Sequence, residues 1–93
     1  MKLMDIWRHK ESNKLIQIES YATNIKTGSD TIVVFNNINR QGYSPSFNGY
    51  GTKEEIESEY ELFICSDRVM QMESYDEIFD ELEMVKWKKK LST

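Results

Sequence analysis

The stretch that decides the fold is Leu15-Ile16-Gln17-Ile18-Glu19-Ser20-Tyr21-Ala22-Thr23. In an extended chain every second side chain points to the same face. One face of this stretch would carry the apolar residues Ile16, Ile18 and Ala22. The other face would carry Gln17, Glu19 and Tyr21. This alternation predicts a β-strand with one face packed on the core.

Shorter segments on both sides of this stretch also predict strands. Residues 5–9 alternate well enough for a short strand, and a polar turn follows at residues 10–13. After the central stretch, residues 26–30 combine a glycine with polar residues that favour a turn. Residues 31–35 are β-branched or apolar throughout, as in a strand that is buried on both faces or central in a small sheet. The first 35 residues therefore predict three antiparallel strands with two tight connections.

Residues 36–51 differ in composition and predict a loop or a pair of turns. The segment holds four asparagines, three of the four glycines and the only proline. It also carries three aromatic residues, Tyr43, Phe47 and Tyr50. Their rings either fold back as a lid over the small core or stand ready for a partner, and the sequence leaves both alternatives open.

The next segment, residues 52–72, begins with a helix-capping pattern, Thr52-Lys53-Glu54-Glu55. Residues 56–64 fit a helix and a strand about equally well, because apolar residues recur at both spacings. We prefer a single helical turn followed by a strand through about Cys65, since a small barrel needs a fourth or fifth strand to close. A turn at residues 66–68 and a short strand at residues 69–72 complete the region.

The clearest predicted helix runs over residues 74–85. It begins with a second capping pattern, Ser74-Tyr75-Asp76-Glu77. The helix then has one apolar stripe, made of Tyr75, Ile78, Phe79, Leu82 and Val85. The basic tail, residues 86–93, either extends this helix or forms an edge strand guarded by lysines.

These elements predict a single α+β domain over residues 1–93. The fold would be a small, strongly bent antiparallel sheet, spanning residues 4 to about 72, with the C-terminal amphipathic helix packed on it. The expected core residues are Ile6, Ile16, Ile18, Ile32, Val34, Leu62, Ile78, Phe79 and Leu82.

Four short segments match a known pattern of small β-barrel proteins. They are Ile6-Trp7-Arg8-His9-Lys10, Asn13-Lys14-Leu15 with Ile18 and Ala22, Thr27-Gly28 before Val33-Val34-Phe35, and Glu59-Tyr60-Glu61-Leu62. Over residues 5–65 the chain thereby resembles a family of small SH3-like β-barrel proteins of unknown function from bacteria and phages. The resemblance implies an SH3-like barrel and a bacterial or phage origin, with no settled activity. The chain departs from the family at residues 36–51, where a shorter, Trp-containing connection is usual, and the tail after Ser74 has no counterpart.

Charge is distributed unevenly along the chain and points to a protein partner. Residues 52–83 hold twelve acids and two basic residues, which gives −10, whereas residues 84–93 hold four lysines and no acid. An acidic chain lacks the basic face that direct nucleic-acid binding uses. The acids either form solvated faces or meet a basic site on another protein, and mimicry of a nucleic acid is one form of this second alternative. The candidate residues are Glu54, Glu57, Glu61, Asp76, Glu77, Asp80 and Glu81.

Two further functions compete with an acidic protein-binding module that inhibits or modulates another protein. One is binding of a nucleotide or other small ligand, for which residues 40–50 offer a guanidinium, aromatic rings and an amide. Its candidate residues are Arg40, Tyr43, Phe47, Asn48 and Tyr50. In a homo-oligomer, two such loops would frame a shared pocket. The other is a structural subunit without a ligand.

The sequence offers little for catalysis, metals or membranes. His9 is the only histidine and Cys65 the only cysteine, so neither a zinc cage nor an internal disulfide is expected. Cys65 ends an apolar run, where an inert thiol is usual, and no glycine-rich phosphate loop is present. We therefore expect no enzyme, no cofactor and no metal. A lone cysteine, no apolar run of about 18 residues and an opening unlike a secretory signal favour the cytoplasm.

Overall fold

Residues 1–23 and 31–91 are described by a computed structural model, with the backbone alone described at residues 23, 31, 44–48 and 89–91. The turn expected at residues 26–30 lies outside this description. The elements are β1 (Ile6–His9), β2 (Leu15–Thr23), β3 (Thr31–Asn39), β4 (Gly42–Thr52), α1 (Lys53–Glu59), β5 (Tyr60–Ile64), α2 (Ser66–Gln71) and α3 (Tyr75–Leu91).

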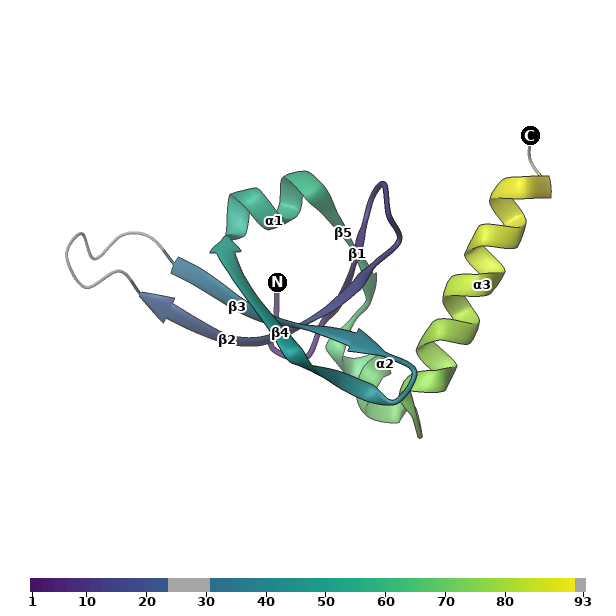
Figure 1. Ribbon diagram of the computed structural model, residues 1–93, viewed down its shortest axis with the longest axis horizontal. Helices are drawn as coiled ribbons and strands as arrows, with labels where there is room; N and C mark the ends of the chain where they lie inside the picture. Colours follow the sequence, from purple (N-terminus) through teal and green to yellow (C-terminus); the bar gives the residue numbers. More distant parts are fainter. Residues whose placement is uncertain (24–30, 92–93) are drawn as a thin grey trace.

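The five strands form one antiparallel sheet in the order β4-β3-β2-β1-β5. The three predicted N-terminal strands are present as β1, β2 and β3. Register shifts occur in three of the four strand pairs, and such irregularities bend and twist a sheet. Figure 1 shows the resulting curvature, with α1 over one side of the sheet and α3 beside it. The α+β class is confirmed, but within the described residues the sheet does not close into a barrel.

The prediction of a loop or a pair of turns at residues 36–51 is wrong. Those residues continue β3 and form β4, joined by a two-residue turn before Gly42, whose φ is 121°. Glycine fits position 49 of β4, because the Cβ atom of any other residue there would lie 2.5 Å from the Phe35 ring. Pro45 is tolerated because β4 is an edge strand, where a backbone N–H can be spared. Pairing with β3 outweighs the local preference of this segment for turns.

For residues 52–72, the predicted helix start and the strand that follows it are confirmed, but the rest of the segment differs. Thr52 caps α1 by accepting the N–H of Glu55 at 3.2 Å, and β5 follows directly. The turn expected at residues 66–68 and the short strand expected at residues 69–72 are both wrong, because these segments form α2 and its C-terminal cap. The carboxylate of Asp5 accepts the N–H of Ser66 at 2.7 Å and so caps α2 from a distant part of the chain. No local sequence pattern predicts this contact, because Asp5 and Ser66 are far apart in the sequence.

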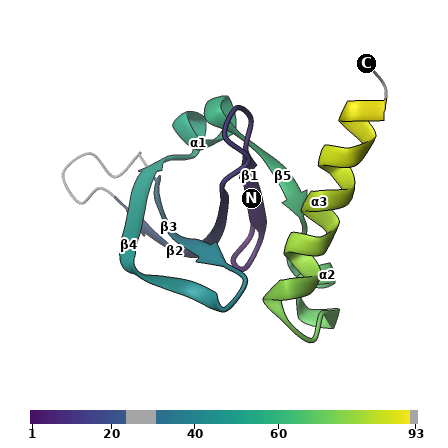
Figure 2. The same ribbon diagram turned by 45° about the vertical axis from the view of Figure 1, so that its right-hand side comes forward.

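Helix α3 runs on through Leu91, so the basic tail continues the helix and the edge-strand alternative is wrong. Its first half packs against the sheet through Ile78 and Leu82. Figure 2 shows the later turns of α3 continuing upward past β5 toward the C-terminus.

The core consists of two clusters on the two faces of β1. The first lies under α3 and consists of Ile6, Leu15, Ile38, Ile64, Ile78 and Leu82. The second lies under α1 and consists of Trp7, Ile16, Ile18, Val33 and Ile56. Of the nine expected core residues, five are buried, namely Ile6, Ile16, Ile18, Ile78 and Leu82.

The other expected core residues are less buried than predicted. Ile32, Val34 and Phe79 are partly buried, and Val33 takes the inward position of β3. Leu62 is 50% exposed, so its assignment to the core is wrong. In the pairing of β1 with β5, Ile6 lies opposite Ile64 and Trp7 opposite Leu62. The extra residue between them, Phe63, breaks the alternation on which the prediction relied.

The two leucines give a matched test of this core. Leu82→Ala removes a side chain buried between α3 and the sheet and should lower the free energy of unfolding by about 2–4 kcal/mol. Leu62→Ala truncates an exposed leucine and should cost less than about 1 kcal/mol. Urea unfolding followed by circular dichroism measures both. Equal losses for the two variants would contradict the assigned helix face.

Candidate binding surface between α2 and α3

The candidate carboxylates fall into separate groups on the molecule. Glu54 and Glu57 are exposed on α1, whereas Asp76, Glu77, Asp80 and Glu81 belong to the first half of α3. Figures 1 and 2 show these two helices on different sides of the sheet. Glu61 lies on β5 and forms an ion pair with Arg8. The acids therefore do not form the single continuous face on which mimicry of a nucleic acid would depend.

Two of the α3 carboxylates are engaged by Arg40, which lies at the turn between β3 and β4. One guanidinium nitrogen of Arg40, Nη1, lies 3.2 Å from Asp76 Oδ1 and 3.1 Å from Asp80 Oδ1. The guanidinium also lies 5.8 Å from the centre of the Phe79 ring. The guanidinium donates hydrogen bonds to the carboxylates of Asp80 and Asp76, and these bonds, that to Asp80 first, raise the pKa of Arg40. Arg40 thus ties the hairpin to α3, and one of its guanidinium nitrogens is already engaged by two carboxylates.

The aromatic residues of the same segment do not gather into one site. Tyr43 lies opposite Ile38 on β3, and its ring centre is 6.0 Å from that of Tyr75. Tyr50 lies opposite Val34, seven residues farther along, or roughly 20 Å in an extended strand. The side chains of Phe47 and Asn48 lie outside the description. The predicted nucleotide site therefore has no geometric counterpart in the described side chains.

A buried hydrogen-bond network fixes the start of α3. The hydroxyl of Tyr75 donates to Gln17 Oε1 at 2.7 Å, and Gln17 Nε2 donates to the backbone oxygen of Met4 at 3.2 Å. Burial, followed by interactions with Tyr43, raises the pKa of Tyr75 to about 12. The network joins the N-terminal turn, β2 and α3, and so positions two walls of the cavity described next.

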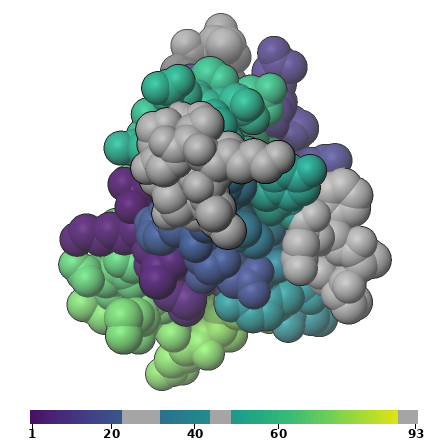
Figure 3. All heavy atoms as spheres, turned by 90° about the vertical axis from the view of Figure 1, so that its left-hand side faces the viewer, coloured from purple at the N-terminus to yellow at the C-terminus, as the bar shows by residue number. Residues whose placement is uncertain are grey.

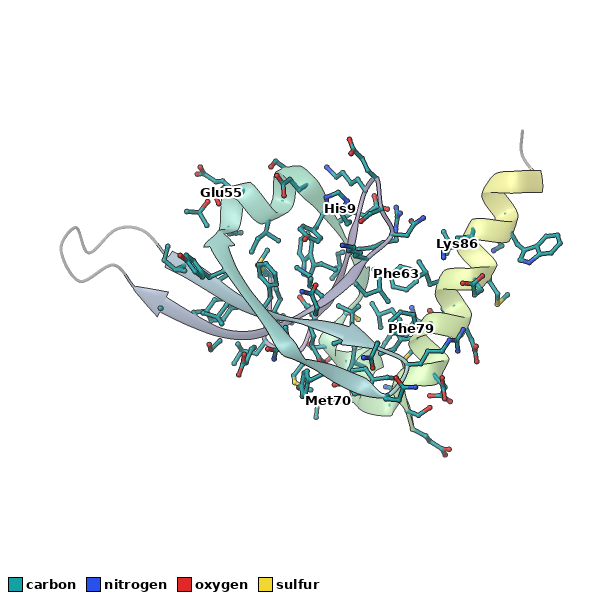
Figure 4. The ribbon with its side chains drawn as sticks, viewed as in Figure 1. His9, Glu55, Phe63, Met70, Phe79 and Lys86 are labelled. Carbon is teal, nitrogen blue, oxygen red and sulfur yellow. The ribbon has the colours of Figure 1, made fainter. Side chains whose placement is uncertain are left out.

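An apolar cavity opens between the N-terminal turn, α2 and the start of α3. Its volume is about 290 Å³, and it is lined by Met4, Val69, Met70, Met72, Glu73, Ser74, Tyr75 and Ile78. Figure 3 shows the N-terminal residues beside the α2 region on one face of the molecule. Met70 is 78% exposed and points outward at the edge of the fold (Figure 4). Three methionines at one opening provide an adaptable apolar surface.

A polar cavity adjoins the apolar one, because both are lined by Met72. The second cavity has a volume of about 320 Å³ and is lined by Arg68, Gln71, Met72, Glu77 and Glu81. Arg68 pairs with Glu81 at 2.5 Å, and Glu77 accepts the backbone N–H of Glu73 at 2.8 Å. The two cavities together are called the α2–α3 groove. Its glutamates, Glu73, Glu77 and Glu81, outnumber its one cation.

The sequence identified part of this groove. Glu77 and Glu81 were candidate residues for a basic partner, and both line it. The methionines were missed, because residues 69–72 were interpreted as a strand. A helical interpretation of that short segment would have placed Met70 and Met72 near the capped start of α3.

The single histidine has a local role in the turn after β1. Its Nδ1 atom accepts the backbone N–H groups of Glu11 at 3.2 Å and Ser12 at 3.1 Å. The ring packs edge-on against Tyr60, with 5.0 Å between centres. A cavity of about 200 Å³ lies beside it, lined by His9, Lys10, Glu11, Ser58 and Glu59. Across the described residues, no group of three or more His, Cys, Asp or Glu side chains is placed to hold a metal ion.

No protein-family model matches the chain, and no curated protein or solved structure matches it either. The resemblance to small SH3-like proteins therefore stays a prediction. In the part of the chain that the structure describes, no helix combines the length and apolar character needed to cross a bilayer.

The Tyr75 network can be tested by removing one hydroxyl. Tyr75→Phe leaves the buried Gln17 oxygen without its donor and should cost about 1–2 kcal/mol of unfolding free energy at neutral pH. Because the pKa of Tyr75 is raised to about 12, the unfolded chain loses this proton at lower pH than the folded chain. Wild-type stability should therefore fall as the pH rises from 10 to 12, and the fall should be shallower in Tyr75→Phe. Urea unfolding across that range measures both effects, and identical slopes would contradict the assignment.

Proposed function

We propose that this chain is a non-catalytic protein-binding module whose α2–α3 groove receives a partner segment that carries apolar and basic side chains. The observation that supports this function is the direct adjacency of a methionine-lined cavity and a glutamate-lined cavity. An apolar side chain of the partner would fill the first cavity, and a lysine or arginine beside it would face the glutamates.

The two cavities would contribute differently to binding. Burial of apolar surface against Met70, Met72 and Val69 would supply most of the affinity. Methionine side chains are unbranched and flexible, so they adapt to partners of different shape. The glutamates would raise the association rate toward a basic partner and make this rate fall with salt. The proposal thus keeps the predicted basic partner and replaces a broad acidic face with one groove.

The strand order supports an SH3-like relationship as part of this proposal. Strand β1 lies between β2 and β5, and the short helix α1 connects β4 with β5. An origin in bacteria or phages, an inhibitory action on the partner and a location in the reducing cytoplasm belong to the same proposal. The lone Cys65, a free thiol, is in keeping with that location.

Selection from a random library of 12-residue peptides tests the groove. We expect the immobilised protein to enrich peptides that combine Leu, Ile, Phe or Trp with Lys or Arg. Met70→Ser should weaken the selected peptides about fivefold to tenfold, because it removes apolar contact area at the mouth of the groove. Fluorescence anisotropy at low and moderate salt measures the affinity.

Met84→Ser is the matched control, since Met84 is also exposed but lies on α3 away from both cavities. This variant should bind the selected peptides as tightly as the wild type does. Enrichment of acidic peptides, or equal losses in the Met70 and Met84 variants, would contradict the proposed site.

A further inference from the structure

We propose that two copies of this chain associate through β4, the outermost strand of the sheet, so that the two sheets become one. The two β4 strands pair antiparallel, and each contributes residues 48–52 to the contact. This dimer does not rest on the function proposed above, because no described residue of β4 lines either cavity of the α2–α3 groove.

The first observation is an open row of hydrogen-bonding groups along β4. In the described part of the chain, β4 pairs with β3 on one side and with no strand on the other. The backbone N–H and C=O groups on the open side are therefore a template for a further strand. Figures 1 and 2 show α1 leading from the end of β4 back toward β5, and so away from this edge. An extended chain can pair there without displacing α1.

The second observation is the absence of charge along this edge. None of the 11 residues of β4 is Asp, Glu, Lys or Arg, although 30% of the chain is charged. Edge strands are usually kept apart by charges, prolines, bulges or short length. In β4 such features protect only the first part, which contains Pro45 and the register shift where the pairing with β3 passes from Tyr43 to Asn48. Residues 48–52 pair with β3 without interruption and lack these features.

The side chains of residues 49–51 alternate between the two faces of the sheet. A Cβ atom at Gly49 would lie 2.5 Å from the Phe35 ring, and one at Gly51 would lie 3.8 Å from Ile56 Cγ1. Both glycines thus face the core cluster under α1. Tyr50, between them, points to the opposite face and is 78% exposed. A strand added beside these three residues would meet no side chain on the inner face and one exposed ring on the outer face.

This pattern selects a second copy as the occupant, because the segment is complementary to itself. With a two-fold axis at residue 50, Tyr50 of one copy lies opposite Tyr50 of the other, and Gly49 lies opposite Gly51. Directly opposed aromatic side chains stabilise antiparallel strand pairs. Pairing of the two segments also removes no charge from water, since residues 48–52 carry none. A strand of another protein would have to match this order of glycines and ring, which the chain itself supplies.

The arrangement closes on itself. Because both copies use the same segment, association stops at the dimer and does not continue into a filament. The opposite edge of the sheet, β5, is five residues long and carries Glu61, so a contact of β4 with β5 of another copy would meet a shorter and charged edge. The contact through residues 48–52 is small, and the dimer should therefore depend on concentration.

Sedimentation velocity from about 10 to 500 µM tests the dimer. The wild-type mass should rise with concentration from 11.0 kDa toward twice that value. Tyr50→Lys should weaken the dimer about tenfold or more, because it places two like charges directly opposite each other. Met84→Lys adds the same charge at an exposed position of α3, so it is the matched control and should dimerise normally. A wild-type protein that stays monomeric at the highest concentration would overturn the proposal.

A mixture of two variants tests the position of the two-fold axis. Tyr50→Lys and Tyr50→Glu should each be monomeric alone, because like charges then meet at the axis. An equimolar mixture should restore dimers, since a lysine of one copy then lies opposite a glutamate of the other. Both substitutions are at an exposed position, and melting temperatures of the separate variants check that they fold. A mixture of folded variants that stays monomeric would overturn the arrangement.

Hydrogen exchange of the backbone amides identifies the strand that pairs. As the protein concentration rises, exchange in residues 48–52 should slow, because N–H groups on the open edge gain partners. Exchange in β5 should stay constant, since that edge takes no part in the contact. A dimer that slows exchange in β5 or α3 and leaves β4 unchanged would overturn the proposal. A library peptide that protects residues 48–52 of a protein that stays monomeric would also overturn it and give the edge to a strand of another protein.

Discussion

Both halves of the core depend on β1, although this strand is only four residues long. Ile6 belongs to the cluster under α3, and Trp7 belongs to the cluster under α1. The strand pairs with β2 on one edge and with β5 on the other, so it also holds the sheet together. Asp5, directly before it, caps α2. A single extended segment therefore fixes the sheet, both clusters and one of the two helices that form the groove.

Buried polar groups then set the positions of the helices. Asp5 accepts N–H groups from Lys2 at 2.8 Å and from Ser66 at 2.7 Å, which places α2 against the N-terminal turn. Gln17 is buried and links Met4 with the hydroxyl of Tyr75, which places α3 against β2. A buried polar group left without its partner is costly, so such contacts favour one arrangement over others. The walls of the α2–α3 groove are the elements that these hydrogen bonds join.

Local sequence patterns predicted the elements whose structure depends on neighbouring residues. They failed for segments whose structure depends on pairing with a distant part of the chain. The alternation of residues 15–23, the Thr52 cap and the apolar stripe of α3 were enough to place β2, α1 and α3. The composition of residues 36–51 indicated turns, but hydrogen bonding to β3 makes most of that segment a strand. Glu77 and Glu81 could be chosen as candidates by their charge alone. The groove itself could not be predicted, because Met4 meets Met70 and Met72 only after the chain has folded.

Helix α3 has two halves that are stabilised in different ways. The first half is held by Ile78 and Leu82 in the core and by ion pairs with Arg40 and Arg68. Among the described side chains of the second half, Glu83 to Lys88, none belongs to the buried core clusters. Isolated helices of this length are marginal in water, so the second half persists as a continuation of a first half that is already formed. The same division leaves Met84 and Trp87 exposed. Their side chains do not support the fold and are therefore free to contact another molecule. In this chain, the contacts that anchor α3 therefore also determine which part of it remains available for binding.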